Sequence, residues 1–186
     1  GLTYIDGQGV RLIYTDNDNN YKIADYDENM AVKSTTELFT AEDNAFVNFD
    51  CADDGTMIAL VVNVQSDYEI GTPEYFENAE FTYELRKYAP DGSGETVIPI
   101  PELGDYYAPY SDVIQNFQLI DGKILIVFSS GKLIMDLEGN ILETRQDGGF
   151  VSYCEDSSGK IIAAADTGYC YMDKLSLTLP ENMTEY

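Results

Sequence analysis

A short module that repeats four times along the chain constrains its fold more than any other feature of the sequence. Each copy has a turn that ends in glycine, a run of apolar residues, a second turn and an amphipathic stretch. The two most regular copies begin with Asp-Gly-Lys-Ile-Leu-Ile-Val-Phe at 121–128 and Ser-Gly-Lys-Ile-Ile-Ala-Ala-Ala at 158–165, and the other two begin near Asp6 and Asp53. The shorter spacings are about 40 residues, a period that indicates a stacked or radial repeat architecture.

The residue types within each copy predict β-strands. They are β-branched or aromatic, alternate in polarity and are punctuated by Gly, Asn, Asp and Ser, whereas no stretch combines a 3.6-residue period with helix caps. Four strands can be assigned to each copy. We expect them at 2–5, 10–15, 20–26 and 30–36 in the first copy; at 45–51, 56–64, 81–88 and 95–100 in the second; at 113–120, 123–128, 132–137 and 140–145 in the third; and at 149–154, 160–165, 169–174 and 175–180 in the fourth.

Within a copy, polarity increases from the second strand to the third. The second strand is nearly all apolar in the last three copies, which predicts burial of both its faces, and the third strand is half polar. This gradient and the period predict an all-β fold of four four-stranded antiparallel blades, a β-propeller. The 186 residues suit one domain, with blades at about 1–40, 41–100, 111–147 and 148–186. Four blades could close alone or form part of a larger ring, which self-association of the chain could complete.

The apolar units at 121–128 and 158–165 resemble those of β-propeller repeat proteins of the loose WD40-like or PQQ-like kind. The chain is also similar to the propeller regions of secreted lipoproteins of anaerobic gut bacteria. The resemblance covers nearly all of the chain. It implies a propeller fold and an extracytoplasmic location, and it assigns no functional residue.

The chain is strongly acidic, which excludes two classes of partner. It has 10 Lys and Arg residues against 34 Asp and Glu residues, a formal net charge of −24. Nucleic acids and anionic membrane surfaces are excluded because both are bound by clustered cations. Cationic partners, metal ions included, are favoured. No run of about 20 apolar residues, the length that spans a bilayer, occurs in the sequence.

Histidine is absent, and this removes much catalytic chemistry. An imidazole base, a Ser-His-Asp triad and histidine ligands to zinc are excluded, whereas carboxylate-only catalysis, as in glycoside hydrolysis, is left open. Cys51, Cys154 and Cys170 lie far apart in strand-like apolar contexts. We expect them to be buried free thiols.

Two long insertions interrupt the repeat, and both are expected on one face of the propeller. One, at 65–80, separates the second and third strands of blade two, and the other, at 101–111, joins blades two and three. Loops of that length are usually functional or disordered. Aromatic residues in them could contact sugars, peptides or proteins, or could instead pack the loops onto the blades. The candidate ligand-binding residues are Tyr68, Tyr75, Phe76, Tyr106, Tyr107 and Tyr110.

One short acidic segment matches part of a calcium loop. Asp16, Asp18 and Asn20 alternate like its first three ligands, and Asp27 stands at the twelfth position. Tyr21 occupies the position where an EF-hand has glycine, so a plain Asn/Asp turn is the alternative interpretation. Apart from calcium, no cofactor is expected.

Together these features predict a non-catalytic, extracytoplasmic binding module whose tyrosine-rich face holds a protein, a peptide or a glycan. One alternative is a carbohydrate-active enzyme that uses paired carboxylates on that face, and another is a structural spacer beside a further domain. No Gly-x-Gly-x-x-Gly, P-loop or Gly-x-Ser-x-Gly motif occurs, and no catalytic residue is assigned.

Overall fold

The computed structural model describes residues 2–5, 9–42, 45–52, 54–69, 72–109, 111–146, 151–156, 158–165, 168–180 and 183–184. The chain divides into two compact units, Gly1–Gly104 and Asp105–Tyr186. Of the described residues, 56% lie in strands and 6% in helices. The predicted all-β class is therefore confirmed.

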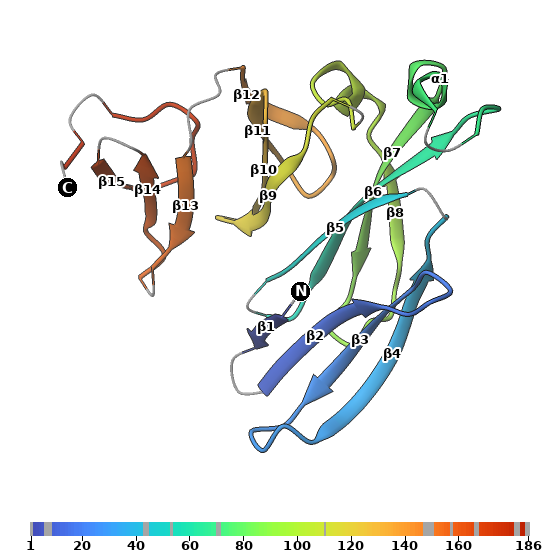
Figure 1. Cartoon of the computed structure of the whole chain (residues 1–186). Coiled ribbons are helices and arrows are strands. Elements are labelled where there is room, and N and C mark those ends of the chain that lie inside the picture. Colours follow the sequence, from blue (N-terminus) through green and yellow to red (C-terminus); the bar gives the residue numbers. More distant parts are fainter. Residues whose placement is uncertain are drawn as a thin grey trace. The chain divides into compact units, whose positions relative to one another are not determined.

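The first unit contains two four-stranded sheets (Figure 1). In each sheet the strands are antiparallel and follow one another in sequence order, so each sheet is a simple meander. The first sheet consists of β1 (Leu2–Ile5), β2 (Gly9–Thr15), β3 (Asn20–Tyr26) and β4 (Val32–Thr40), and the second of β5 (Phe46–Cys51), β6 (Met57–Gln65), β7 (Glu80–Tyr88) and β8 (Thr96–Pro99).

The second unit repeats this design. Its first sheet is a four-stranded antiparallel meander, and its second sheet has three named strands. The strands are β9 (Ile114–Ile120), β10 (Lys123–Phe128), β11 (Gly131–Met135) and β12 (Ile141–Arg145), followed by β13 (Val151–Glu155), β14 (Ile161–Ala165) and β15 (Gly168–Met172). The first fifteen predicted strands correspond to β1–β15, and β1, β3 and β10 have the predicted bounds.

The strand predicted at 175–180 is wrong. These residues form no strand, because their backbone N–H groups bond to side chains. The N–H of Leu175 donates to the Asp121 carboxylate at 2.9 Å, and that of Leu177 donates to Glu143 at 3.0 Å. Both leucine side chains are buried, so the apolar alternation that suggested a strand packs an irregular segment instead. Thr184, further along the chain, pairs with Tyr169 of β15.

Two one-turn helices, which no pattern in the sequence predicts, lie in the two insertions. They are α1 (Pro73–Glu77) and η1 (Pro101–Asp105). Each begins with proline, whose fixed φ suits the first position of a helix. A single turn is too short for a 3.6-residue apolar period to be recognised in a sequence.

The second strand of each sheet carries much of the core. In β6, the residues from Met57 to Val62 are at most 1% exposed, and in β10 those from Ile124 to Phe128 are buried, so both faces of these strands are covered as predicted. In β14, by contrast, buried and half-buried residues alternate. The outermost strands β4 and β12 are largely exposed. The fourth strand is thus more exposed than the second in these sheets, but the third strand does not always lie further out, because all five residues of β11 are buried.

A buried arginine joins the two sheets of the first unit. Arg11, on β2, is 1% exposed and donates to both carboxylate oxygens of Asp25, at 2.7 and 3.0 Å. It also donates to the carbonyl oxygens of Gly55 at 3.0 Å and Pro90 at 2.6 Å, which lie in turns of the second sheet. The guanidinium lowers the pKa of Asp25. One side chain thus satisfies a carboxylate and two backbone carbonyls across the packed sheets.

Two of the cysteines follow the prediction and one does not. Cys51 and Cys170 are buried free thiols, whereas Cys154 is a free thiol that is exposed on β13. The prediction of burial is therefore wrong for Cys154. It fails because Cys154 lies on the half of β13 that alternates away from the core, together with the exposed Ser152.

One five-residue turn recurs six times in the described part of the chain. The N–H of its first residue bonds to the carbonyl of its fifth, and its fourth residue has a positive φ. The turns begin at Asp16, Asp27, Ala52, Ala89, Asp136 and Asp156. Glycine or asparagine at the fourth position tolerates this conformation, and five turns follow that rule; Met30 is the exception, at φ 61°. An aspartate in the turn accepts backbone N–H groups, for example Asp156 from Ser158 and Lys160.

These turn carboxylates make stability depend on pH. Hydrogen bonds from Ser158 lower the pKa of Asp156, those from Ser93 lower the pKa of Asp91, and the Lys22 ammonium lowers that of Asp16. A carboxyl group whose pKa is lower in the folded state than in the unfolded state stabilises the fold at any pH above the unfolded pKa of about 3.9. This stabilisation is lost as the pH falls through the folded pKa. We expect the melting temperature to fall when the pH drops below about 4.

The double variant Asp91→Asn with Asp156→Asn tests this dependence. An asparagine oxygen still accepts the backbone N–H groups but does not titrate, so the variant should fold and lose less melting temperature between pH 5 and pH 3. Calorimetry over a pH series measures the difference. Equal acid sensitivity in the variant and the parent chain would show that these carboxylates are not responsible.

Candidate functional site

The most elaborate connection in the first unit joins β6 to β7. The two strands pair to their ends, where Gln65 lies opposite Glu80, and α1 lies in the connection between these two residues. The N–H of Tyr75 donates to the carbonyl of Thr72 at 3.1 Å where α1 begins. The Asn78 side chain donates to the carbonyl of Glu74 at 2.9 Å and closes the C-terminal end of α1. These local bonds stabilise the single turn of α1.

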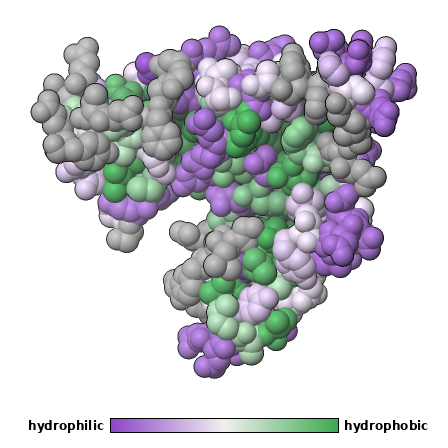
Figure 2. Space-filling view, in the orientation of Figure 1, coloured by the Kyte–Doolittle hydropathy of each residue, from purple (hydrophilic) through white to green (hydrophobic). Residues whose placement is uncertain are grey.

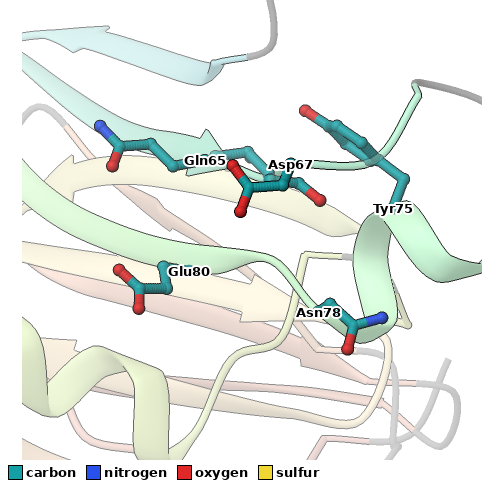
Figure 3. Close-up of a pocket in the computed structure, with 7 residues that line it drawn as sticks. Gln65, Asp67, Tyr75, Asn78 and Glu80 are labelled. Carbon is teal, nitrogen blue, oxygen red and sulfur yellow. The ribbon is translucent and has the colours of Figure 1, made fainter.

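A pocket of about 450 Å³ lies beneath this connection, and we call it the β6–β7 pocket. Figure 3 shows its side chains on three sides: Gln65 and Asp67 at the end of β6, Glu80 at the start of β7, and Tyr75 and Asn78 on or just after α1. The lining residues are Val64, Gln65, Ser66, Asp67, Tyr75, Asn78 and Glu80. Each of these described lining residues comes from the hairpin at 64–80.

The lining chemistry selects for ligands that are neutral or positively charged. Asp67 and Glu80 supply carboxylates, which accept hydrogen bonds, and Gln65 and Asn78 supply amides, which both donate and accept. Among the described residues the lining has no Lys or Arg, so these residues offer no positive charge to an anion. Tyr75 is 3% exposed and forms an inner wall, whereas Tyr68, close by in the chain, is 49% exposed. The arrangement can hydrogen-bond hydroxyl, amide or ammonium groups.

The predicted tyrosines separate into exposed and buried side chains. Tyr68 is exposed, Tyr106 is half-buried, and Tyr75 and Tyr107 are each 3% exposed. In the second unit, the Tyr107 ring packs on that of Phe128, with centroids 5.9 Å apart. Tyr75 and Tyr107 therefore pack the two insertions, as the alternative interpretation expected. The Phe76 side chain and Tyr110 lie outside what the structure describes.

Several pocket residues were not identified from the sequence. Gln65, Ser66, Asn78 and Glu80 were not candidates, because isolated polar residues at strand ends and in loops give no motif. The available signal was length, since an insertion of this size between paired strands is usually functional or disordered. That signal marked the correct segment but not its side chains.

The acidic segment at 16–20 forms the Asn/Asp turn. The Asp16 carboxylate accepts the N–H of Asp18 at 2.9 Å, the N–H of Asn20 at 3.1 Å and the Asn20 side-chain amide. The Lys22 ammonium lies 2.7 Å from the Asp16 carboxylate, so a metal ion at this carboxylate would compete with the ammonium. Asp27 caps the next turn, accepting from Asn29 and Ala31. Within the described ranges, no group of three or more Cys, Asp or Glu residues is arranged to hold a metal ion.

Comparison with models of known protein families, with curated proteins and with solved structures found no match to this chain. In the part of the chain that the structure describes, none of the helices is long and apolar enough to cross a membrane.

Proposed function

We propose that the four sheets are blades of a β-propeller and that the chain is an extracytoplasmic, non-catalytic binding module that holds a glycan in the β6–β7 pocket. The propeller is supported by sequential antiparallel sheets whose second strands are apolar and whose outermost strands are exposed. The extracytoplasmic location rests on the resemblance to propeller regions of secreted lipoproteins.

The observation that carries the binding proposal is the lining of the pocket. Carboxylates and primary amides are groups that hydrogen-bond sugar hydroxyls. A carboxylate accepts hydrogen bonds from the hydroxyls, and an amide both donates to them and accepts from them. Asp67, Glu80, Gln65 and Asn78 bring these groups together. Tyr68 adds an exposed aromatic ring close by in the chain, which can pack on the apolar face of a sugar ring. An acidic glycan is disfavoured by the lining and by the net charge of −24.

A glycan array followed by calorimetric titration tests this proposal. For a neutral glycan retained on the array, Asp67→Ala and Tyr68→Ala should each weaken binding at least about tenfold, which corresponds to about 1.4 kcal/mol. Tyr171→Ala is the matched control, because Tyr171 is also exposed, at 57%, but lies on β15 in the second unit. Unchanged affinity in Asp67→Ala and Tyr68→Ala would refute binding in this pocket. If the protein binds basic peptides and no glycan, the ligand of this pocket is cationic and the proposed glycan is wrong.

A carbohydrate-active enzyme is the second candidate function, because two carboxylates line the same pocket. Glycoside hydrolysis requires a pair of them, about 5–10 Å apart, one of which acts as an acid. Incubation of the bound glycan with the protein, followed by chromatography, separates the two candidates. Cleavage that disappears in both Asp67→Asn and Glu80→Gln would establish an enzyme, and an intact glycan would support a binding module.

A further inference from the structure

The segment that builds the β6–β7 pocket is acidic throughout. Residues 66–80, which run from the end of β6 to the start of β7, include no Lys or Arg. Their acidic residues are all exposed: Asp67, Glu69, Glu74, Glu77 and Glu80. Figure 2 shows mostly hydrophilic residues on the visible surface around α1. An acidic surface raises the local concentration of cations and repels anions, so the pocket attracts a positively charged group.

Neither carboxylate of the pocket has a positively charged partner in the part of the chain that the structure describes. Arg11, Lys22 and Arg86 of the same unit pair with other carboxylates. Asp67 and Glu80 are exposed, so water solvates them in the free protein. A ligand that covers them removes part of this water, and a charge that loses its water without gaining a partner costs free energy. A positively charged ligand offsets that cost, whereas a neutral ligand does not.

The pocket is also rich in hydrogen-bond acceptors. The Asn78 side chain already donates to the carbonyl of Glu74 at 2.9 Å, which uses one of its two N–H donors and leaves its oxygen to accept from a ligand. The carboxylates of Asp67 and Glu80 add groups that only accept. An ammonium has three donors and no acceptor, so it matches this set better than a hydroxyl does. Hydrogen bonds between an ammonium and a carboxylate are, in addition, roughly twice as strong as neutral ones.

We propose that the β6–β7 pocket selects glycans that carry a free amino group, such as those built from glucosamine, over neutral glycans. This inference rests on the proposed glycan-binding function and specifies the class of sugar. The ammonium would bond to the carboxylates of Asp67 and Glu80, and the neighbouring sugar hydroxyls would bond to the amides of Gln65 and Asn78.

A basic peptide also carries ammonium groups, but the lining favours the sugar. Lysine holds its ammonium on a four-carbon apolar stem. The lining residues Val64 and Tyr75 are buried, at 4% and 3% exposure, so this stem would contact little apolar surface. An amino sugar instead has hydroxyl groups next to its ammonium, and these match the polar side chains of Gln65, Ser66 and Asn78.

Calorimetric titration with three matched trisaccharides tests this proposal. The β-1,4-linked trimers of glucosamine, N-acetylglucosamine and glucose differ only at carbon 2 of each sugar, which carries an ammonium, a neutral amide or a hydroxyl. We expect the glucosamine trimer to bind at least about fivefold more tightly than the other two at low salt. Added salt should reduce this preference, because it screens the attraction between exposed charges.

Three charge-neutralising variants locate the preference. Asp67→Asn and Glu80→Gln each remove one charge of the pocket and keep the shape of the side chain. Each should lower the ratio of the association constants for the glucosamine and glucose trimers at least about threefold. Glu77→Gln is the matched control, because Glu77 is exposed on α1 in the same hairpin but does not line the pocket. Its ratio should stay within about twofold of that of the parent chain.

Several results would overturn the amino-sugar proposal. Equal affinity for the three trimers would do so, as would no binding of the glucosamine trimer or a ratio that falls as far in Glu77→Gln as in Asp67→Asn. Equal affinities that Asp67→Ala weakens would still support a glycan pocket, whereas failure of every glycan on the array would overturn the proposed function as well. A lysine-rich peptide that binds more tightly than the glucosamine trimer would assign the pocket to a peptide instead.

Discussion

Replacement of Ile126 by aspartate is expected to unfold the second unit or leave the protein insoluble. Ile126 lies in the middle of β10, pairs with Phe117 and Leu133, and is 0% exposed. A buried carboxylate with no partner costs several kcal/mol, and the total stability of a domain is only about 5–15 kcal/mol. The soluble yield, the circular dichroism spectrum and the melting temperature measure the effect.

Leu142→Asp is the matched control for that variant. It makes a similar change of an aliphatic residue to aspartate in the same sheet, but Leu142 is 53% exposed on β12. Surface substitutions of this kind usually change stability by less than about 0.5 kcal/mol. A soluble Ile126→Asp variant with the melting temperature of the parent chain would mean that β10 is not buried on both faces.

Replacement of Arg11 by methionine is expected to destabilise the first unit by about 3 kcal/mol. Methionine keeps much of the apolar stem but removes all four hydrogen bonds, leaving the Asp25 carboxylate and the carbonyls of Gly55 and Pro90 without the guanidinium. Breaking a buried ion pair on one side leaves an uncompensated charge and costs more than the pair contributes. The loss is moderated because Asp25 is 25% exposed and also accepts from Ser34.

Calorimetric and denaturant unfolding measure this loss, with Lys160→Met as the control. Lys160 is exposed in a turn of the second unit, so its replacement should change stability by less than about 0.5 kcal/mol. The double variant Arg11→Met with Asp25→Leu should recover part of the loss, because it removes the orphaned carboxylate as well. An Arg11→Met variant as stable as the parent chain would show that the guanidinium bonds contribute nothing net.

The strands could be predicted from the sequence because their signals are local. At 121–128 an Asp-Gly turn precedes five consecutive apolar residues, and the structure has Asp121 and Gly122 at φ 54° and 64° before β10 begins. Positive φ at both positions is what a two-residue hairpin turn of type I′ requires. The segment at 175–180 shows the limit of this reasoning, since alternating leucines specify burial but not the backbone partner.

The candidate site was less accessible to prediction. Tyr68 and Tyr75 lie in the same insertion and carry the same side chain, yet one is 49% exposed and the other 3%. The difference arises from α1, which turns Tyr75 inward and is too short to show a helical period. Asp16 likewise resembles a metal ligand in the sequence, but in the folded turn it accepts N–H groups and pairs with Lys22.

The all-β class, the positions of fifteen strands and the segment that carries the candidate site could all be predicted from the sequence. These properties depend on alternation, turn residues and chain length, all of which act between near neighbours. The bonds of Arg11 to turns of another sheet and the burial of Tyr75, by contrast, appear only in the folded chain. Those properties depend on groups far apart in the chain, whose contacts no local pattern encodes.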